Sequence, residues 1–494
     1  MSFSRIAEMT RVPIRLNNNK RPSLAAFCFC VLITSCTQEE FLKTDPNLAS
    51  YPFDDYVCAD FTVEATEASF DQPLPIAEQD MSNGAHPIAG VVSHHALASD
   101  WINAFFNDLS AKRDIDTFII LSPRHYSQGD SYISLSPLPW QVGDTVVEVE
   151  KRYYEQFSHQ LGLNADPWAF SGEHGIETLL PYIAHYFPDA KIMPILQKEK
   201  PLRLDLLSSL SDVVAEVIER EPGAFLLISS DFSHHEGVEI TRTRDAKSRV
   251  FLEVLCDASL GIVGCDNIGS MFVLQDVLQS ENQIRTVIRN HTDSLKISGE
   301  QELDITSYFF SYFTVPEHDS HDELFDAVRR SVREGLSGAK NVGFEDYIYS
   351  DANSGIAVRF RSGDTERGCI AYYKGISDFT SAAASAAKNA AFFDGRYPTI
   401  QRDELKDLTI EISLIGAGFK MTDPLNFIPG HHSLLITGPG GQAFLQASVA
   451  EQKDMNRKDF LRAVSLKAGL DADSWQESDF DLIRFPTEYF SEKF

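Results

Sequence analysis

Short apolar runs alternate with longer amphipathic stretches between residues 51 and 315. The amphipathic stretches, such as 99–112 and 201–220, are typical of helices that pack one face against a core. Strands that alternate with helices favour a mainly parallel sheet covered by helices on both faces. The pattern therefore predicts an α/β domain over residues 51–315. Its expected strands are the apolar runs at 88–94, 117–123, 191–196 and 224–231.

A different pattern follows the polar segment 315–323, which is the expected linker. The next stretch places Leu324, Val328 and Val332 on one side of a helix. The elements that follow are mixed in order, which predicts an α+β domain over residues 318–494. They are strands at 355–362 and 408–415, a close-packed alanine-rich helix within 380–400, and a helix at 457–470 with a stop at Gly469.

The N-terminal segment has the layout of an export signal. Within residues 20–36, basic residues precede an uncharged apolar run that is too short to span a bilayer. The small residues before Cys36 resemble the lipobox of bacterial lipoproteins, which implies cleavage before Cys36 and lipidation of its thiol. We therefore expect a signal peptide over 1–35, an acidic tether over 36–50 and a lipoprotein anchored at the bacterial cell envelope, facing the periplasm or the outside. The alternatives are an ordinary secretory signal and a cytosolic protein with a chance apolar stretch.

Composition and charge narrow the class of protein. The 494 residues include 43 Lys and Arg against 72 Asp and Glu, which gives a formal net charge of −29. This charge argues against a nucleic-acid partner, since nucleic-acid surfaces need clustered cations. It also leaves the lipid anchor as the expected contact with a membrane. The 7 cysteines are scattered without a CxxC pair, so no disulfide framework is expected.

Histidines follow three of the four expected strands of the first domain. Because the carboxyl ends of parallel strands meet at one edge of a sheet, these side chains are expected to converge. Neutral imidazole is the commonest metal ligand, and a thiolate such as that of Cys265 is a strong one. The pattern predicts a metal site at this edge, with ordinary polar loops as the alternative. The residues after the strands are His94, His95, His125, Asp231, His234 and His235.

Five short motifs occur in order along this domain. They are His94-His95-Ala96-Leu97-Ala98, Ser122-Pro123-Arg124-His125, Glu173-His174-Gly175-Ile176-Glu177, Ser229-Ser230-Asp231-Phe232-Ser233-His234 and Cys265-Asp266. As an ordered set they resemble the Memo family, protein B of the AmmeMemoRadiSam system, which is similar in fold to class III extradiol ring-cleaving dioxygenases. The sequence departs from the family at Leu97-Ala98, where the family has Gly-Tyr, and at Asp266, where it has glycine.

The resemblance implies metal ligands at His95, His125 and Cys265, with the neighbouring His94 as the alternative to His95. In the dioxygenases the third ligand is a carboxylate, and the three ligands hold ferrous iron with open positions. A thiolate from Cys265 makes the donor set softer, so iron, copper and zinc all remain candidates.

The resemblance also implies roles around the metal. His234 matches the histidine that the dioxygenases use as an acid and base, a task that suits an imidazole because its pKa lies near working pH. Asp231 is expected to orient His234 or to help close the site. Glu173, His174 and Glu177 are expected to orient the ligands from outside, and the last two share one face if the segment is helical.

Three motifs extend along the second domain. They are Arg367-Gly368-Cys369-Ile370, Phe393-Asp394-Gly395-Arg396-Tyr397-Pro398 and Lys467-Ala468-Gly469-Leu470, with Trp475 shortly after. As a set they resemble the AMMECR1 family, protein A of the same system, except that Glu366 and Ala371 replace a leucine and a glycine. Cys369 follows Arg367, and a nearby cation lowers the pKa of a thiol. Cys369 is therefore a candidate reactive thiol, with a half-buried strand cysteine as the alternative.

Three functions follow from these features. The leading one is a membrane-anchored Memo/AMMECR1 fusion with dioxygenase-like, redox-linked chemistry at one iron or copper ion and a small-molecule substrate. The second is a metal-binding or redox partner protein without turnover of its own, and the third is a zinc-type hydrolase with His234 as base. The family resemblance implies a radical SAM protein as a partner.

Overall fold

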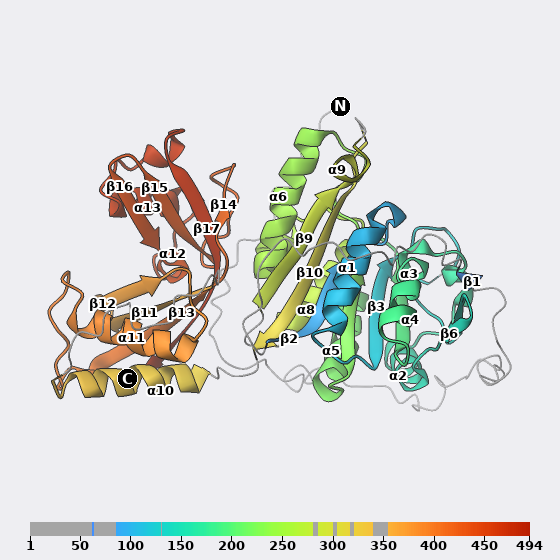
Figure 1. The fold of residues 1–494 in the computed structure, drawn as a ribbon, viewed down its shortest axis with the longest axis horizontal. Helices are drawn as coiled ribbons and strands as arrows, with labels where there is room; N and C mark the ends of the chain where they lie inside the picture. Colours follow the sequence, from blue (N-terminus) through green and yellow to red (C-terminus); the bar gives the residue numbers. More distant parts are fainter. Residues whose placement is uncertain are drawn as a thin grey trace, which may run out of the picture. The chain divides into compact units, whose positions relative to one another are not determined.

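The computed structural model describes residues 62–63, 85–129, 131–279, 285–299, 304–316, 321–338 and 354–494. The predicted signal peptide, the tether and Cys36 lie outside these residues. Within these ranges, no helix has both the length and the apolar character needed to cross a bilayer. The ribbon contains one large sheet in each half of the chain, each with its own helices (Figure 1).

The first large sheet has the strand order β4-β7-β3-β8-β2-β10-β9. The neighbours β7, β3, β8 and β2 run parallel, whereas β4, β10 and β9 are antiparallel to the strands beside them. The strands are β2 (Ala85–Val92), β3 (Thr117–Pro123), β4 (Ile133–Leu135), β7 (Lys191–Gln197), β8 (Ala224–Ser229), β9 (Arg285–Asp293) and β10 (Ser307–Pro316). A small sheet consists of β1 (Thr62–Val63), β5 (Trp140–Val142) and β6 (Thr145–Val147).

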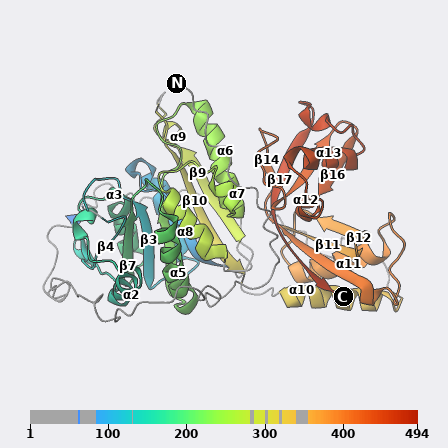
Figure 2. The ribbon, with the colours of Figure 1, turned by 180° about the vertical axis from the view of Figure 1, so that it is seen from behind.

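Helices cover both faces of this sheet, which is why its central strands are buried along their whole length. Helices α1 and α4 lie on one face, seen in Figure 1, and α5 and α8 lie on the other, seen in Figure 2. Their bounds are α1 (Ser99–Ser110), α4 (Leu180–Tyr186), α5 (Leu204–Arg220) and α8 (Ile268–Gln279). The other helical segments are η4 (Ala96–Ala98), α2 (Lys151–Leu161), η5 (Pro167–Phe170), α3 (His174–Glu177), α6 (Val238–Val254), α7 (Asp257–Leu260) and α9 (Ser294–Ser298). The predicted α/β class is confirmed.

The second large sheet is antiparallel throughout, in the order β12-β11-β13-β17-β15-β16 with β14 beside β17. Its strands are β11 (Gly355–Ser362), β12 (Thr365–Tyr372), β13 (Leu408–Ile415), β14 (Phe419–Lys420), β15 (His432–Gly438), β16 (Gly441–Leu445) and β17 (Asp481–Lys493). The helical segments are α10 (His321–Gly335), α11 (Phe379–Phe392), η7 (Leu405–Asp407), α12 (Ala447–Gln452), α13 (Arg457–Lys467) and η8 (Ser474–Gln476). The predicted α+β class is confirmed.

Local signals account for the bounds of the helices in this half. The alanine-rich helix α11 begins where the Asp378 side chain accepts a hydrogen bond from the Ser381 amide at 2.9 Å. Its alanines are buried, which allows close packing against α10 and β11. Asn456 caps α13 in the same way, and Gly469 follows its end in the left-handed conformation at φ 76°.

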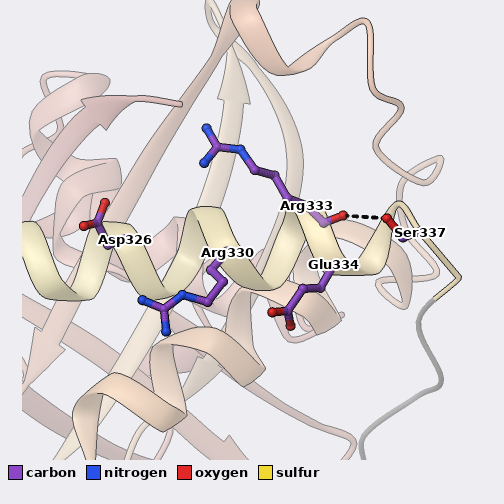
Figure 3. Close-up of a pocket in the computed structure, with 5 residues that line it drawn as sticks. All are labelled: Asp326, Arg330, Arg333, Glu334 and Ser337. Atoms are coloured by element: carbon purple, nitrogen blue, oxygen red, sulfur yellow. Dashed lines mark hydrogen bonds between the residues drawn. The ribbon is translucent and has the colours of Figure 1, made fainter.

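A surface pocket of about 440 Å³ lies along α10. Figure 3 shows that its side chains project from one helix and spread to both sides of it rather than converging. The lining residues are Asp326, Arg330, Arg333, Glu334 and Ser337. Its charges belong to both signs, and Ser337 donates its hydroxyl to the carbonyl of Arg333 at 3.3 Å. This pocket therefore does not bring its charged groups together around one point.

Candidate metal centre

Loops at the carboxyl edge of the first sheet bring three histidines and two carboxylates together. The parallel strands β2, β3 and β8 end at Val92, Pro123 and Ser229, so the residues that follow them emerge side by side. The loop before α8 adds the side chain of Asp266. We call the resulting group the histidine–carboxylate cluster; it consists of His94, His125, His234, Asp231 and Asp266.

His94 is fully buried in the cluster, and its ring orientation is set by hydrogen bonds. Its Nδ1 lies 2.9 Å from Oγ of Ser229, and that hydroxyl donates to the carbonyl of Gly175 at 2.5 Å. Because the Ser229 proton is used on Gly175, Nδ1 of His94 is the donor in their contact. Nε2 is then the nitrogen with the free lone pair, and it faces the carboxylates of the cluster.

His125 is oriented by a buried carboxylate. Glu173 is 0% exposed, and its Oε1 lies 2.6 Å from Nδ1 of His125. The same carboxylate accepts the backbone amides of His125 at 2.9 Å and of Gly175 at 3.2 Å. An ionised carboxylate only accepts hydrogen bonds, so Nδ1 of His125 carries the proton and Nε2 faces the cluster. This pairing of a carboxylate with a histidine is common behind metal ligands.

Gly175 is required where α3 passes the end of β3. A Cβ at this position would lie 2.1 Å from Oγ of Ser122 and 3.3 Å from Cε1 of His125. The absence of a side chain therefore lets the Gly175 carbonyl reach Ser229 and its amide reach Glu173. One glycine supports the orientation of both His94 and His125.

Asp266 lies at the centre of the cluster. Its Oδ1 accepts hydrogen bonds from Oγ of Ser230 at 2.9 Å and from the amide of Asp231 at 3.1 Å. Its Oδ2 faces three imidazole nitrogens, at 3.1 Å from Nε2 of His94, 3.6 Å from Nε2 of His234 and 3.7 Å from Nε2 of His125. Oδ2 is buried and has no hydrogen-bond partner within the described residues. An unpartnered buried oxygen among three imidazoles is the strongest chemical signal of the site.

Asn267 fixes the loop that carries Asp266. Its side chain is buried, donates to the carbonyl of Ser229 at 2.9 Å and accepts from Nε2 of Gln197 at 2.9 Å. These bonds connect the loop to the ends of β8 and β7. The carboxylate therefore reaches the cluster because a residue beside it is anchored to the sheet.

Asp231 and His234 complete the cluster from the loop after β8. Asp231 is 1% exposed, accepts the hydroxyl of Ser93 at 2.6 Å and lies 3.9 Å from Nε2 of His94. The His234 side chain is 33% exposed, yet its Nε2 is buried and has no hydrogen-bond partner among the residues described. His234 thus places one buried nitrogen in the cluster while the ring remains reachable from solvent.

His174 lies at the solvent side of the cluster. Its ring centroid is 3.9 Å from that of His125 and 5.3 Å from that of His94, and Nδ1 contacts the hydroxyl of Tyr126 at 3.3 Å. Burial and the neighbouring His125 lower the pKa of His174 to about 4. Glu177 lies on the same short helix, where burial raises its pKa to about 7.

The carboxylates of the cluster increase the proton affinity of its three imidazoles. Burial lowers the pKa of His125, but the carboxylates of Asp266 and Glu173 outweigh it and raise this pKa to about 9. Burial acts against His94 and His234 too, and nearby carboxylates raise both pKa values. For Asp266, burial raises the pKa, but the three imidazoles hold it well below its usual range. A positive charge is therefore favoured at the point where these atoms meet, carried by protons or by a metal ion.

The structure gathers some of the predicted site residues and leaves others outside. His95 is exposed, its Nδ1 accepts the amide of Leu97 at 3.2 Å, and its ring lies 5.7 Å from that of Tyr308. Cys265 is partly buried, and burial raises the pKa of its thiol to about 12. Among the described residues, the donor atoms of two sets lie within 4.8 Å of one another, and these sets are His94, His125 and His174, and His94, Asp231 and Asp266. They contain His94 and Asp266, which are the neighbours of His95 and Cys265. His125, His234, Asp231, Glu173 and His174 are where the sequence placed them, at or beside the cluster.

The second half of the chain places Cys369 in a different setting from the predicted one. Arg367 forms a two-pronged ion pair with Glu404 at 2.7 and 2.9 Å, so it is engaged away from the thiol. Burial, joined by the charge of Glu366, raises the pKa of Cys369 to about 11. Its backbone amide donates a hydrogen bond to the Asp394 carboxylate at 3.0 Å, and its carbonyl accepts one from Arg396 at 2.6 Å. The thiol is protonated at neutral pH, and Arg367 does not lower its pKa.

Comparisons with known proteins divide the chain in the same way. The family model for Memo-like proteins matches residues 84–258, and the AMMECR1 model matches residues 325–490. A MEMO1 family protein of Pyrobaculum arsenaticum is 29% identical over 241 residues, which are 46% of this chain and 82% of that protein. A protein of Methanosarcina mazei is 30% identical over 177 residues, 35% of this chain and 85% of that protein. The crystal structure of an uncharacterized protein from Pyrococcus horikoshii covers 35% of this chain and 90% of its own, with 23% identity and a TM-score of 0.31.

Fold and site together define a two-part protein, an α/β domain with histidines and carboxylates at the carboxyl edge of its sheet and an antiparallel α+β domain after it. The chain carries a Memo-like domain, matched over residues 84–258, and an AMMECR1 domain, matched over residues 325–490, and it has MEMO1 family homologues. The predicted resemblance to both families is confirmed.

Proposed function

We propose that the Memo-like part of this fusion is a mononuclear metal protein with dioxygenase-like, redox-linked chemistry. The ligands we propose are Nε2 of His94, Nε2 of His125 and Oδ2 of Asp266. The observation that supports them most is the buried Oδ2 of Asp266, which faces imidazole nitrogens and lacks a hydrogen-bond partner among the described residues. His94 and Asp266 take the places that the sequence gave to His95 and Cys265.

Two of the three separations between the proposed donor atoms are close to those around a single ion. Ligand bonds of about 2.0–2.2 Å separate neighbouring donors by roughly 3–3.5 Å, and Oδ2 of Asp266 lies 3.1 Å from Nε2 of His94 and 3.7 Å from Nε2 of His125. The hydrogen bonds of Ser229 and Glu173 leave both Nε2 atoms as lone-pair donors. Two imidazoles and one carboxylate are the ligand set that non-haem ferrous oxygenases use.

A carboxylate in place of the predicted thiolate changes the preferred metal. Oxygen ligands are harder than sulfur, so the site favours iron(II) over copper(I), and zinc also suits two imidazoles and a carboxylate. Ferrous iron with open positions binds oxygen and a substrate and supplies redox chemistry. The substrate is expected to be a small molecule that enters past His174 and Tyr126, the exposed residues beside the cluster.

The remaining members of the cluster would handle protons and charge. His234 has one buried Nε2 in the cluster and a partly exposed ring, so it can exchange protons with solvent and pass one to or from a bound substrate. Asp231 adds a fixed negative charge near His94, which stabilises a cation in the site. Glu173 and Ser229 hold the two ligand rings.

Nitric oxide binding to the iron-loaded full chain tests this proposal. Nitric oxide occupies the open position of a ferrous site, so we expect a high-spin iron–nitrosyl EPR signal in the wild type and its loss in His94→Ala. Oxygen uptake is then measured with candidate aromatic substrates. Bound iron with no nitrosyl signal and no oxygen uptake would instead support the metal-binding partner protein without turnover.

Zinc-type hydrolysis is the second candidate, because His234 lies almost as close to Oδ2 of Asp266 as the other imidazoles do, at 3.6 Å. Zinc held by His94, His125 and Asp266 would keep a fourth position for a water, and His234 would act as the base toward that water. The variant His234→Ala tests whether His234 is a base or a ligand. Zinc affinity that falls by more than about tenfold would make His234 a fourth ligand and close the site to water, which contradicts hydrolysis, whereas an unchanged affinity keeps it as an acid and base.

Metal binding is expected to compete with protons. A ligand imidazole must lose its proton before it can bind a metal, and the pKa of His125 is raised to about 9 by Asp266 and Glu173 against the effect of burial. The apparent zinc affinity is therefore expected to rise with pH, to level off above about pH 9, and to release protons on binding. Calorimetry in buffers of different ionisation enthalpy measures the proton count. An affinity that stays constant below about pH 9 would contradict this expectation.

We also propose that Cys36 carries the lipid anchor, which would place the protein at the cell envelope. The pattern of residues 20–36 supports this proposal. In cells fed a labelled fatty acid, the wild type is expected to take up label and to sediment with membranes, and Cys36→Ala is expected to do neither. Label that persists in Cys36→Ala would contradict the anchor.

A radical SAM protein is the partner that the AmmeMemoRadiSam grouping suggests for both parts of the chain. Co-purification of the tagged full chain with a radical SAM protein from the same organism tests this proposal. Failure of the two purified proteins to associate at micromolar concentration would count against it.

A further inference from the structure

A buried carboxylate on helix α6 connects three separate segments beside the cluster. Asp245 is 5% exposed, and its Oδ1 accepts the hydroxyls of Ser233 at 2.9 Å and Ser307 at 2.6 Å. Its Oδ2 lies 2.8 Å from Nε2 of His291 on β9. An ionised carboxylate donates no hydrogen bond, so all three neighbours donate to it. One of them, Ser233, is the residue directly before His234.

The loop that carries His234 is also paired with the start of β10. The amide of Phe232 donates to the carbonyl of Ser307 at 2.9 Å, and the amide of Ser307 donates to the carbonyl of Ser233 at 3.0 Å. The amide of Ser233 donates to Oγ of Ser307 at 3.0 Å. Because Ser307 Oγ accepts this bond and donates its own proton to Asp245, the carboxylate fixes both sides of the pairing.

The backbone after His234 is strained. His235 has φ 54°, in the left-handed region that residues with a side chain rarely adopt. Such a conformation is unfavourable by itself and persists only where neighbouring contacts hold it. The contacts here are the two-way backbone pairing of Glu236 with Ile305, the contact of His235 Nδ1 with Oδ1 of Asp304 at 2.7 Å, and the bonds that end on Asp245.

We propose that Asp245 is a positioning residue that aims Nε2 of His234 at the metal site through Ser233 and Ser307. The inference rests on the proposed function and adds a residue outside the histidine–carboxylate cluster. Without this carboxylate, two buried hydroxyls lose their acceptor and the strained turn at His235 loses part of its support. His234 then moves, whereas His94 and His125 stay in place because Ser229 and Glu173 hold them independently.

Proton NMR of the cobalt-loaded full chain tests this inference, since a bound Co²⁺ shifts the ring resonances of nearby imidazoles far outside the normal range. The His234 resonance is identified by its absence in His234→Ala. In Asp245→Ala we expect this resonance to move or to disappear while those of His94 and His125 remain. Glu239→Ala changes an exposed acid on the same helix and is expected to leave every shifted resonance in place.

Two further variants keep the test decisive if Asp245→Ala does not fold. Asp245→Asn retains the oxygen that accepts from Ser233 and Ser307, and it is expected to restore the wild-type His234 resonance. Ser233→Ala removes one of the two bonds and is expected to shift it. An unmoved His234 resonance in Asp245→Ala, or in Ser233→Ala if Asp245→Ala does not fold, overturns this inference alone. A wild type that binds no Co²⁺ overturns the proposed function and this inference with it.

Discussion

Asp266→Ala is expected to lose metal binding. We expect its affinity for zinc or ferrous iron to be at least about 100-fold below that of the wild type, because loss of a residue that merely orients a ligand can already cost that much. Asp266 supplies the oxygen that faces His94, His125 and His234 at 3.1 to 3.7 Å. Without it, the remaining donors are imidazoles that repel one another once protonated. Competition calorimetry against a chelator of known affinity measures the change.

Cys265→Ala is the matched control because it alters the residue next to Asp266. The Cys265 thiol is protonated at neutral pH, since burial raises its pKa to about 12. We expect Cys265→Ala to bind metal as the wild type does. The account would be contradicted by the reverse result, in which Cys265→Ala loses the metal and Asp266→Ala keeps it.

Glu173→Gln is expected to lower the metal affinity by about 10–100-fold, the usual effect of losing the partner of a histidine ligand. Glu173 accepts bonds from Nδ1 of His125 and from two backbone amides. A glutamine keeps one acceptor oxygen but turns an NH₂ group toward one of these donors. A buried donor left unpaired costs about 1–3 kcal/mol, so the free energy of unfolding of the metal-free protein falls as well.

Glu177→Gln is the control for this change, since Glu177 lies on the same short helix. Burial raises the pKa of Glu177 to about 7 in the folded protein. Ionisation of this carboxyl therefore opposes folding once the pH rises above the pKa that it has in the unfolded chain. Glutamine removes that ionisation. We expect metal affinity to be unchanged and thermal stability at pH 8 to be equal or slightly higher. Equal losses of affinity in Glu173→Gln and Glu177→Gln would show that a general disturbance of the helix is responsible.

The sequence predicted which edge of the sheet carries the site, because the central strands have a clear apolar pattern. Residues 117–123 form β3 as predicted, and the runs at 191–196 and 224–231 coincide with β7 and β8 within two residues. Parallel strands buried on both faces read as continuous apolar runs, so their ends mark the ligand edge. His125 and His234 could be found from this rule alone, without knowledge of any long-range contact.

The choice between adjacent residues could not be made from the sequence. β2 ends at Val92, two residues earlier than predicted, and His94 rather than His95 turns toward Ser229 and Asp266. A shift of one position reverses the direction of a side chain near a strand end. The orientation of Asp266 likewise depends on Asn267, whose partners Ser229 and Gln197 are far away in the sequence.

The outer strands were also missed, for a physical reason. β10 is buried from Ser307 to Thr314, with α1 and α6 packed against it, so its polar and apolar residues do not alternate. Its first residue, Ser307, is buried, and its hydroxyl donates to a distant partner, Asp245. A segment of this kind has no periodic signal, although it holds the loop that carries His234.

X-ray absorption at the zinc K-edge of the zinc-loaded full chain is the most direct test of the proposed metal ligands, because it reports the atoms bound to the metal. A site of His94, His125 and Asp266 predicts nitrogen and oxygen neighbours at about 2.0–2.2 Å and no sulfur. A sulfur neighbour at about 2.3 Å would place the Cys265 thiolate on the metal and contradict the account. Failure of the full chain to bind zinc would contradict it as well.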